Sequence, residues 1–310
     1  MSRNMNLKQL IKRLAKKTLQ RSYWYNNELF PDCEKFWTYS TFNTEVVNLG
    51  STSGLYAFDY KGLPFKAANW ALRHNPLLGD LSILKNYSSY LTPSKSTVIL
   101  PLCPFSSLAG RYESLEDHYY TILYPTTIPS FSYQREQKII SVKQNPFLYY
   151  PAVAVFKDFV MLFKPHTKQL RTEAQMEKDA QSWINNWMKE FSLKDLISPL
   201  SLLNKDAIED AAHSINQMIE YCASHNIRLA IVIPPMYHTL SSRFAPECRE
   251  IIIEELINKL KGRSFFFHNY MDDDTFNNRM DFFYNSFLLN TKGAKLFTQR
   301  VLTDLGLLKS

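Results

Sequence analysis

"VVNLGSTSGLYAFDY", residues 46–60, begins with an apolar run that has the composition of a short buried strand. A glycine and small hydroxyl residues follow at 50–54, and a helix-compatible stretch comes next. A strand that ends in such a turn before a helix can present a hydroxyl group at the edge of a sheet. The stretch therefore raises the question of whether this turn holds a working nucleophile.

Strand and helix signals alternate along the rest of the chain. Short apolar runs predict strands at 44–50, 64–71, 96–103, 227–235 and 264–270. Amphipathic spacing predicts helices at 75–91, 205–226, 246–262 and 290–306. This alternation predicts an α/β fold with a five-stranded parallel sheet covered by helices on both faces.

Residues 104–170 interrupt the alternation and are rich in Tyr, Phe and Pro. We expect this segment to lack regular elements and to form a lid or a substrate-binding insertion. Its aromatic side chains could stack on sugar rings or simply pack over the sheet, and the sequence leaves both interpretations open.

Composition limits the class of protein. The chain has 310 residues, of which 45% are hydrophobic and 14% aromatic, and this is enough for a sizeable core. Its four cysteines show no zinc-site spacing, which favours free thiols in a reducing compartment.

The sequence has no apolar run of about 18 residues and no secretory signal core, so we expect a cytoplasmic protein. No cofactor is expected, and Asp272–Asp274 is interpreted as a solvated loop or helix cap rather than a metal site.

Positive charge is concentrated in residues 1–21, which we separate as a basic amphipathic arm from a single domain at 22–310. The arm holds seven Lys and Arg and no acidic residue, whereas the remainder holds 29 of each sign. Its leucines follow helical spacing, as in a helix that lies on anionic lipid. The alternative is an ordinary helix that docks its leucines on its own domain. Nucleic acid is not an expected partner, because the body has no basic surplus.

Three segments carry a family resemblance: "GSTSG" at 50–54, "IPPMYH" at 233–238 and "FYNSFLLNTKGAKLFT" at 283–298. In this order and strand context they resemble the SGNH (GDSL-type) hydrolase superfamily. The similarity is greatest to a branch found among bacterial surface-polysaccharide and teichoic-acid D-alanylation proteins. It covers roughly residues 45–101 and 226–305. The resemblance implies a flavodoxin-like, SGNH-type three-layer sandwich and a carbohydrate or acylated glycan intermediate as the partner.

The catalytic positions of that family are altered together. Thr52 stands where the family has its nucleophilic serine, Asn285 stands at the aspartate, and Leu288 stands at the general-base histidine. A hydroxyl is a weak nucleophile until a base accepts its proton, and leucine cannot do so. The usual mechanism is therefore expected to be absent.

Ligands of open parallel sheets bind beyond the carboxyl ends of the strands, and the candidate residues are taken from there. His238 could serve as a rearranged base for a hydroxyl of the turn. The glycine-flanked turn could hold an anion on its amide groups, although it lacks a P-loop lysine. The catalytic candidates are Ser51, Thr52, His238 and Asn285. The ligand-binding candidates are Gly50, Ser53, Gly54, Asn69 and Tyr237.

Two functions follow from the resemblance and remain open. The first is an esterase or acyltransferase of surface-polysaccharide biosynthesis or modification with a rearranged site. The second is a catalytically silent relative that binds a glycan intermediate or a partner enzyme at the inner face of the membrane. A hydrogen bond between His238 and a hydroxyl of the turn would favour the first.

Overall fold

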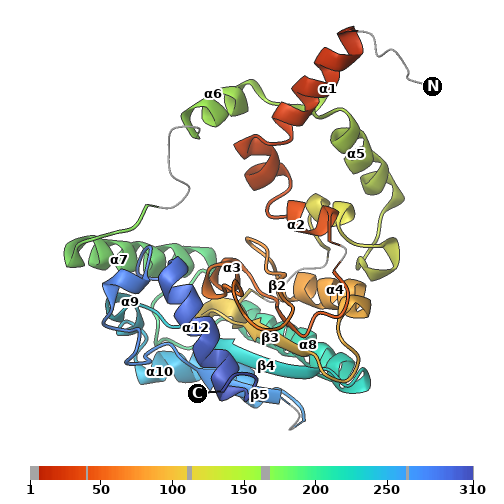
Figure 1. Cartoon of the computed structure of the whole chain (residues 1–310). Helices are drawn as coiled ribbons and strands as arrows, with labels where there is room; N and C mark the ends of the chain where they lie inside the picture. The colour runs from red at the N-terminus through yellow and green to blue at the C-terminus, as the bar shows by residue number, and fades with distance from the viewer. Residues whose placement is uncertain (1–6, 40, 110–113, 162–167, 263–264, 310) are drawn as a thin grey trace. The chain divides into compact units, whose positions relative to one another are not determined.

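The computed structural model describes residues 7–39, 41–109, 114–161, 168–262 and 265–309 (Figure 1). It forms two compact units, Met1–Ser40 with Ser114–Thr167, and Thr41–Glu113 with Lys168–Ser310. We call them the helical unit and the α/β unit. Residues 22–40 had been expected in the single domain at 22–310, but they pack within the helical unit instead. Residues 1–6 of the expected arm lie outside the described residues.

The α/β unit is built on a five-stranded sheet whose strands are all parallel, in the order β2-β1-β3-β4-β5. The strands are β1 (Val46–Asn48), β2 (Ala67–Asn69), β3 (Thr97–Pro101), β4 (Arg228–Ile233) and β5 (Phe265–Asn269). All five lie within the predicted segments. This is the flavodoxin-like strand order, and it reverses between β1 and β3.

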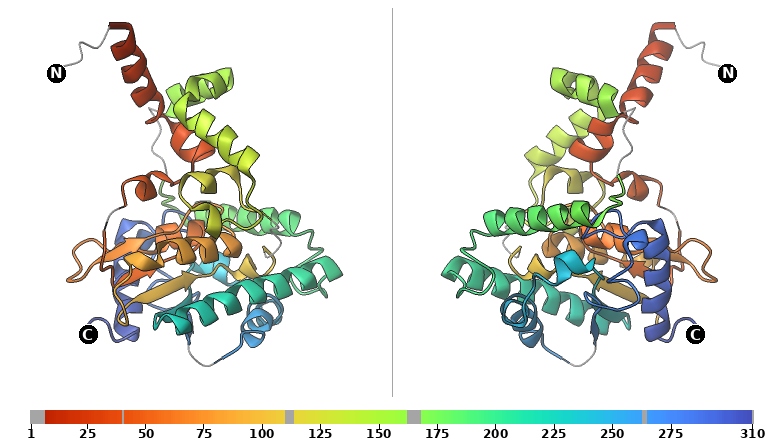
Figure 2. Two further views of the ribbon diagram at one scale, coloured as in Figure 1. Left: turned by 90° about the vertical axis from the view of Figure 1, so that its right-hand side faces the viewer. Right: turned by 90° about the vertical axis from the view of Figure 1, so that its left-hand side faces the viewer.

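Helices cover both faces of this sheet, and the fold is therefore the predicted flavodoxin-like three-layer sandwich. Figure 2 shows α12 (Thr291–Asp304) and α8 (Leu202–Ser224) on opposite sides of the sheet. The short α3 (Thr52–Ala57) contacts α12, and α4 (Leu77–Tyr87) contacts α8. The remaining helices of this unit are α7 (Glu173–Glu190), α9 (His238–Ser241), α10 (Pro246–Arg249) and α11 (Glu255–Asn258), with a π-helical turn at Glu250–Glu254 between the last two.

Successive strand residues alternate between the two faces, because side chains of a strand point to opposite sides. Val46, Ile99 and Val232 join one buried cluster with residues of α12, including Phe297 and Val301. Almost every residue of β1, β3 and β4 is buried, as the apolar runs predicted for a sheet covered on both faces.

The helical unit contains α1 (Leu7–Leu19), α2 (Glu34–Trp37), α5 (Tyr133–Gln144) and α6 (Ala152–Met161), together with a π-helical turn at Trp24–Leu29 and short 3-10 turns. The prediction that residues 104–170 lack regular elements is therefore wrong. Tyr119 and Tyr120 are buried there, and Trp37 donates a hydrogen bond to Thr121 and packs on Tyr25. Trp24 packs on Tyr150 at 4.9 Å between ring centroids, so aromatic packing joins residues 22–40 to the second segment of this unit.

No helix in the described part of the chain is long and apolar enough to cross a membrane.

Candidate functional site

The turn after β1 has the backbone geometry that its glycines suggest. Gly50 adopts φ +108°, a region that side chains rarely occupy, and a Cβ there would lie 3.1 Å from the carbonyl oxygen of Pro101. A Cβ at Gly54 would lie 2.7 Å from the carbonyl oxygen of Leu49. Both glycines therefore allow close approach of backbone segments. The helix that follows, α3, has only six residues, so the turn has little helix dipole with which to hold an anion.

A buried carboxyl group accepts a hydrogen bond from the backbone of this turn. The Asp80 carboxyl accepts a hydrogen bond from the Gly50 amide at 2.7 Å and another from the Asn75 side-chain amide. Burial raises the pKa of Asp80 to about 8 and outweighs the two hydrogen bonds, which act in the opposite direction. The raised pKa favours the neutral acid, so Asp80 is poorly suited to stabilise an imidazolium.

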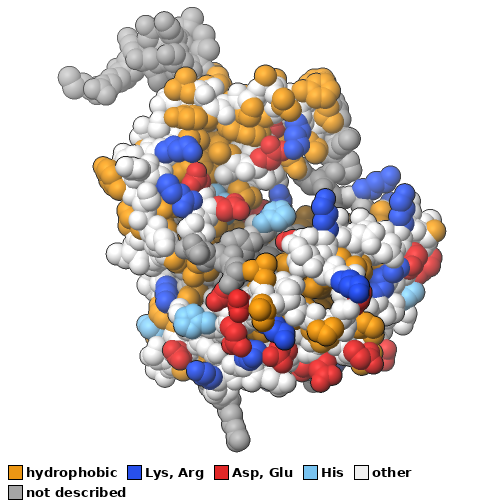
Figure 3. Space-filling view, turned by 180° about the vertical axis from the view of Figure 1, so that it is seen from behind, with side chains coloured by type: hydrophobic (Ala, Val, Ile, Leu, Met, Phe, Trp, Pro, Cys, Tyr) orange, Lys and Arg blue, Asp and Glu red, His pale blue; other side chains and the backbone are white. Residues whose placement is uncertain are grey.

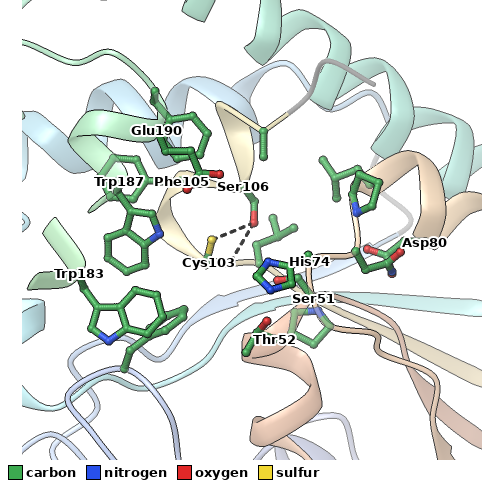
Figure 4. Close-up of a pocket in the computed structure, with 18 residues that line it drawn as sticks. Ser51, Thr52, His74, Asp80, Cys103, Phe105, Ser106, Trp183, Trp187 and Glu190 are labelled. Carbon is green, nitrogen blue, oxygen red and sulfur yellow. Dashed lines mark hydrogen bonds between the residues drawn. The ribbon is translucent and has the colours of Figure 1, made fainter. Parts of the chain in front are cut away.

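A pocket opens beside the turn, where the strand order reverses (Figure 4). It has a volume of about 210 Å³ and lies at the carboxyl ends of β1 and β3, the place where ligands bind in sheets of this topology. Ser51 and Thr52 line it, as do Cys103 and Ser106 from the segment after β3. Figure 4 shows the rings of Trp183 and Trp187 on one side of this pocket and Ser51, Thr52 and His74 on another.

The aromatic wall of the pocket comes from α7 and from the loop before α12. Phe287 packs edge-on against Trp183 at 4.9 Å between ring centroids and against Trp187 at 5.2 Å. This loop is held on α7 by Ser286, whose backbone amide and hydroxyl both donate to the Asp179 carboxylate, at 3.0 and 2.6 Å. The wall is therefore built by a fixed contact between the two segments.

Asn285 and Leu288, at which the sequence resemblance would place an acid and a base, have structural roles in the fold. The Asn285 side-chain oxygen accepts hydrogen bonds from the backbone amides of Phe287 at 3.0 Å and Leu288 at 2.7 Å. Leu288 is buried. Asn285 therefore closes a tight turn and Leu288 fills the core, and neither can accept a proton from a hydroxyl.

His238 and Tyr237 lie at a different place. The His238 Nε2 atom is 2.9 Å from a carboxylate oxygen of Glu173, and the Tyr237 hydroxyl donates to the same carboxylate at 2.6 Å. Burial raises the pKa of Tyr237, and the contact with Glu173 acts in the same direction. Among the described residues, His238 makes no hydrogen bond with Ser51, Thr52 or Ser53, and neither His238 nor Tyr237 lines the pocket. His238 therefore lacks, among the described residues, the hydrogen bond to a hydroxyl of the turn that would favour it as a rearranged base.

Asn69 and Ser53 are also outside the pocket. The Asn69 side-chain amide donates to the carbonyls of Gly54, Leu55 and Phe58, and its oxygen accepts from the Asn48 side chain at 3.1 Å. It therefore satisfies carbonyls at the end of α3. Ser53 is buried, and its hydroxyl has no hydrogen-bond partner within the described residues. Of the predicted residues, the structure brings only Ser51 and Thr52 into the pocket.

Sequence reasoning missed several pocket residues. His74 is exposed, adopts φ +55°, and lines the pocket with Ser51 and Thr52. Glu190, at the end of α7, lines the pocket as well. Helical spacing of Met176, Ala180, Ile184 and Trp187 in α7 is the signal that could have located the wall.

The loop at Asp272–Asp274 is occupied by other contacts. Asp272 forms an ion pair with Arg249, and the Asp273 carboxylate caps the amide of Thr275 at 2.9 Å. No group of three or more His, Cys, Asp or Glu side chains in the described ranges is arranged to hold a metal ion.

Comparison of the chain with protein-family models finds no match, and a search of curated proteins finds none either.

Proposed function

We propose that this protein is a catalytically silent, SGNH-like protein of bacterial surface-polysaccharide biosynthesis or modification that binds a sugar unit of a glycan intermediate. The observation that carries the proposal is the pocket at the β1/β3 switch point, which combines an aromatic wall with polar side chains and lacks a triad base at the family position. The resemblance of the three sequence segments supplies the substrate class.

The chemistry of the lining suits a sugar ring. The carbon-bound face of a sugar is apolar and packs on aromatic rings such as that of Trp183, whereas its hydroxyl groups need polar partners. His74, Glu190 and Ser106 line the same pocket and offer donors and acceptors. At about 210 Å³ the pocket is smaller than the roughly 300–1,000 Å³ of drug-sized sites, so it fits one sugar unit or acyl group rather than a long chain.

Loss of the usual mechanism supports binding over hydrolysis. Thr52 lies in the pocket, but Leu288 replaces its base and His238 pairs with Glu173. A protein of this kind would act in the cytoplasm, at the inner face of the membrane. Lipid-linked glycan intermediates or a partner enzyme would bind to it there. The basic arm at 1–21 favours that location.

One observation favours a second candidate function, an acyl esterase or acyltransferase. His74 lines the same pocket as Ser51 and Thr52, so an imidazole and two hydroxyls share one space. Neither hydroxyl makes a hydrogen bond with another described residue. In that reaction His74 would accept the hydroxyl proton while the oxygen attacks the acyl carbon of an ester. The acyl C–O bond would then break, and His74 would return the proton to the departing alcohol oxygen.

Calorimetric titration with N-acetylglucosamine and its O-acetylated forms tests the binding function. Trp183→Ala, which removes part of the aromatic wall, is expected to lower the association constant by roughly tenfold or more. Tyr133→Ala, at an exposed position of the helical unit, is the matched aromatic control, and His238→Ala is a second control outside the pocket. Both controls should bind as the wild type does. Absence of binding to every probe, or unchanged binding by Trp183→Ala, contradicts the proposal.

Hydrolysis of p-nitrophenyl acetate distinguishes the two functions. The silent protein is expected to show no turnover above the buffer rate. Turnover that disappears in His74→Ala and in either Thr52→Ala or Ser51→Ala would replace the binding function with the enzymatic one.

A further inference from the structure

The helical unit presents large apolar side chains that its own core does not use. They lie on α6 and on the 3-10 turn η6 (Pro146–Tyr149), whose hydrophobic side chains gather on the surface of this unit in Figure 3. In α6 only Ala154 is buried. The large exposed side chains, with their exposed fractions, are Phe147 49%, Leu148 79%, Val153 77%, Val155 53%, Phe156 72% and Phe159 61%. We call these six residues the apolar surface.

Polar contacts hold α6 in place from its other side. The Asp158 carboxylate accepts a hydrogen bond from the backbone amide of Trp24 at 2.7 Å and another from the Tyr150 hydroxyl. Lys157 forms an ion pair with Glu28. The helix is therefore oriented by polar contacts, of which that of Asp158 is partly buried, and the apolar surface faces solvent. Large apolar patches of this kind mark interaction sites on monomeric proteins.

The charge of the same unit indicates the partner. The helical unit holds 13 Lys and Arg against 7 Asp and Glu, a net charge of +6, which is almost all of the chain's +7. Helix α1 contacts η6, and its Arg13 and Lys17 are exposed without an acidic partner among the described residues. Leu10 and Leu14 of α1 are also exposed, at 38% and 56%. These two leucines are therefore open to a partner.

We propose that the apolar surface and α1 together dock the protein on an anionic lipid bilayer. Helix α6 has ten residues and is about 15 Å long, half of the roughly 30 Å hydrocarbon core, so it lies in the interface rather than crossing it. Its Phe and Val side chains enter the acyl boundary while the bases of α1 contact headgroups. A neutral apolar partner would explain the surface on α6 but not the adjoining positive charge. Docking on lipid does not depend on the identity of the pocket's ligand.

Sedimentation with vesicles of phosphatidylglycerol and phosphatidylcholine tests this docking. The wild type is expected to bind anionic vesicles at low salt, to bind pure phosphatidylcholine at least tenfold more weakly, and to lose affinity as salt rises. Val153→Ser/Phe156→Ser and Arg13→Glu/Lys17→Glu are each expected to lower the partition coefficient by roughly tenfold or more.

Matched controls come from exposed positions of the α/β unit. Leu202→Ser/Leu203→Ser removes a comparable exposed apolar area, and Lys85→Glu/Lys205→Glu makes the same change in net charge. Both should bind vesicles as the wild type does. The proposal is overturned if the wild type does not bind anionic vesicles, or if the control pairs lose as much binding as the test pairs. A dimer in light scattering that dissociates in Val153→Ser/Phe156→Ser, without vesicle binding, assigns the surface to self-association instead.

Discussion

The carboxyl group of Asp80 is buried beneath the Gly50 turn, and this makes the stability of the fold depend on pH. Burial raises its pKa to about 8, so the folded chain binds the proton more tightly than the unfolded chain does. The contribution of Asp80 to stability is then greatest below the unfolded pKa near 4, is lost as pH rises toward 8, and changes no further above it. At roughly 1.4 kcal/mol per pKa unit the loss is about 6 kcal/mol at most.

Asp80→Asn keeps a side-chain oxygen that can accept both hydrogen bonds and removes the titration. We expect the free energy of unfolding of Asp80→Asn, relative to that of the wild type, to be higher at pH 9 than at pH 5 by a few kcal/mol, measured by urea unfolding. Glu220→Gln, at an exposed position of α8, is the control and should keep the wild-type pH dependence. Parallel pH profiles of Asp80→Asn and the wild type would show that the buried carboxyl is not the titrating group.

Cys103 is the cysteine that should react with an alkylating reagent. It is partly exposed and lines the pocket, whereas Cys33, Cys222 and Cys248 are buried. Burial raises the pKa of the Cys103 thiol, so less thiolate is present at neutral pH and labelling by iodoacetamide should be slow at pH 7 and faster at pH 9. A bound sugar is expected to protect it. Mass spectrometry that finds the four cysteines labelled at equal rates in the folded protein would refute this accessibility.

Individual elements show how much of the fold is readable from the sequence. The runs at 96–103 and 227–235 contain β3 and β4, because strands buried on both faces are apolar without interruption. Helices α5 and α6 were missed because aromatic residues and prolines around them mask a helical period. The local sequence pattern therefore identifies strands that are buried on both faces. It fails for helices whose formation depends on tertiary packing.

Some residues of the candidate site can also be predicted from the sequence, whereas others cannot. The turn at Gly50, Ser51 and Thr52 is local and was predicted from a few adjacent residues. His74 and the wall on α7 lie far from that turn in sequence and reach the pocket only through the fold. His238 follows a strand at the expected edge, but its pairing with Glu173 depends on the position of α7, which no spacing rule gives.

The start of α12 is packed too closely for a side chain at Gly293. A Cβ there would lie 2.2 Å from the carbonyl oxygen of Phe282, which is backbone and cannot move aside cheaply. Alanine normally stabilises a helix by about 1 kcal/mol relative to glycine. We nevertheless expect Gly293→Ala to lower the free energy of unfolding by roughly 1–3 kcal/mol. Lys295→Ala, exposed on the same helix, is the control and should change stability by less than about 0.5 kcal/mol. A Gly293→Ala variant that is more stable than the wild type would contradict the packing.

On the scale of the whole molecule, the chain combines two units with different compositions. The α/β unit is close to neutral and holds the pocket, whereas the helical unit carries a net charge of +6 and the apolar surface. Because the helical unit is assembled from two separate segments, its boundary could not be read from a change in composition at one point of the sequence. Contacts among the buried Tyr25 and Phe30 and the partly buried Trp37 contribute to a separate core of the helical unit.

Separate cores predict that damage to one unit leaves the other intact. Phe30 is fully buried and packs edge-on against Tyr25 at 5.0 Å and Trp37 at 5.9 Å between ring centroids. Phe30→Ala should cost roughly 3–5 kcal/mol within the helical unit. In hydrogen exchange we expect faster exchange of amides in α2 and α5 and unchanged protection of β3 and β4, since local stability follows cooperative units. Val98→Ala in β3, whose side chain is fully buried, should give the reverse pattern. If Phe30→Ala accelerates exchange in β3 and β4 as much as in α5, the two units unfold as one, and the prediction of separate cores is wrong.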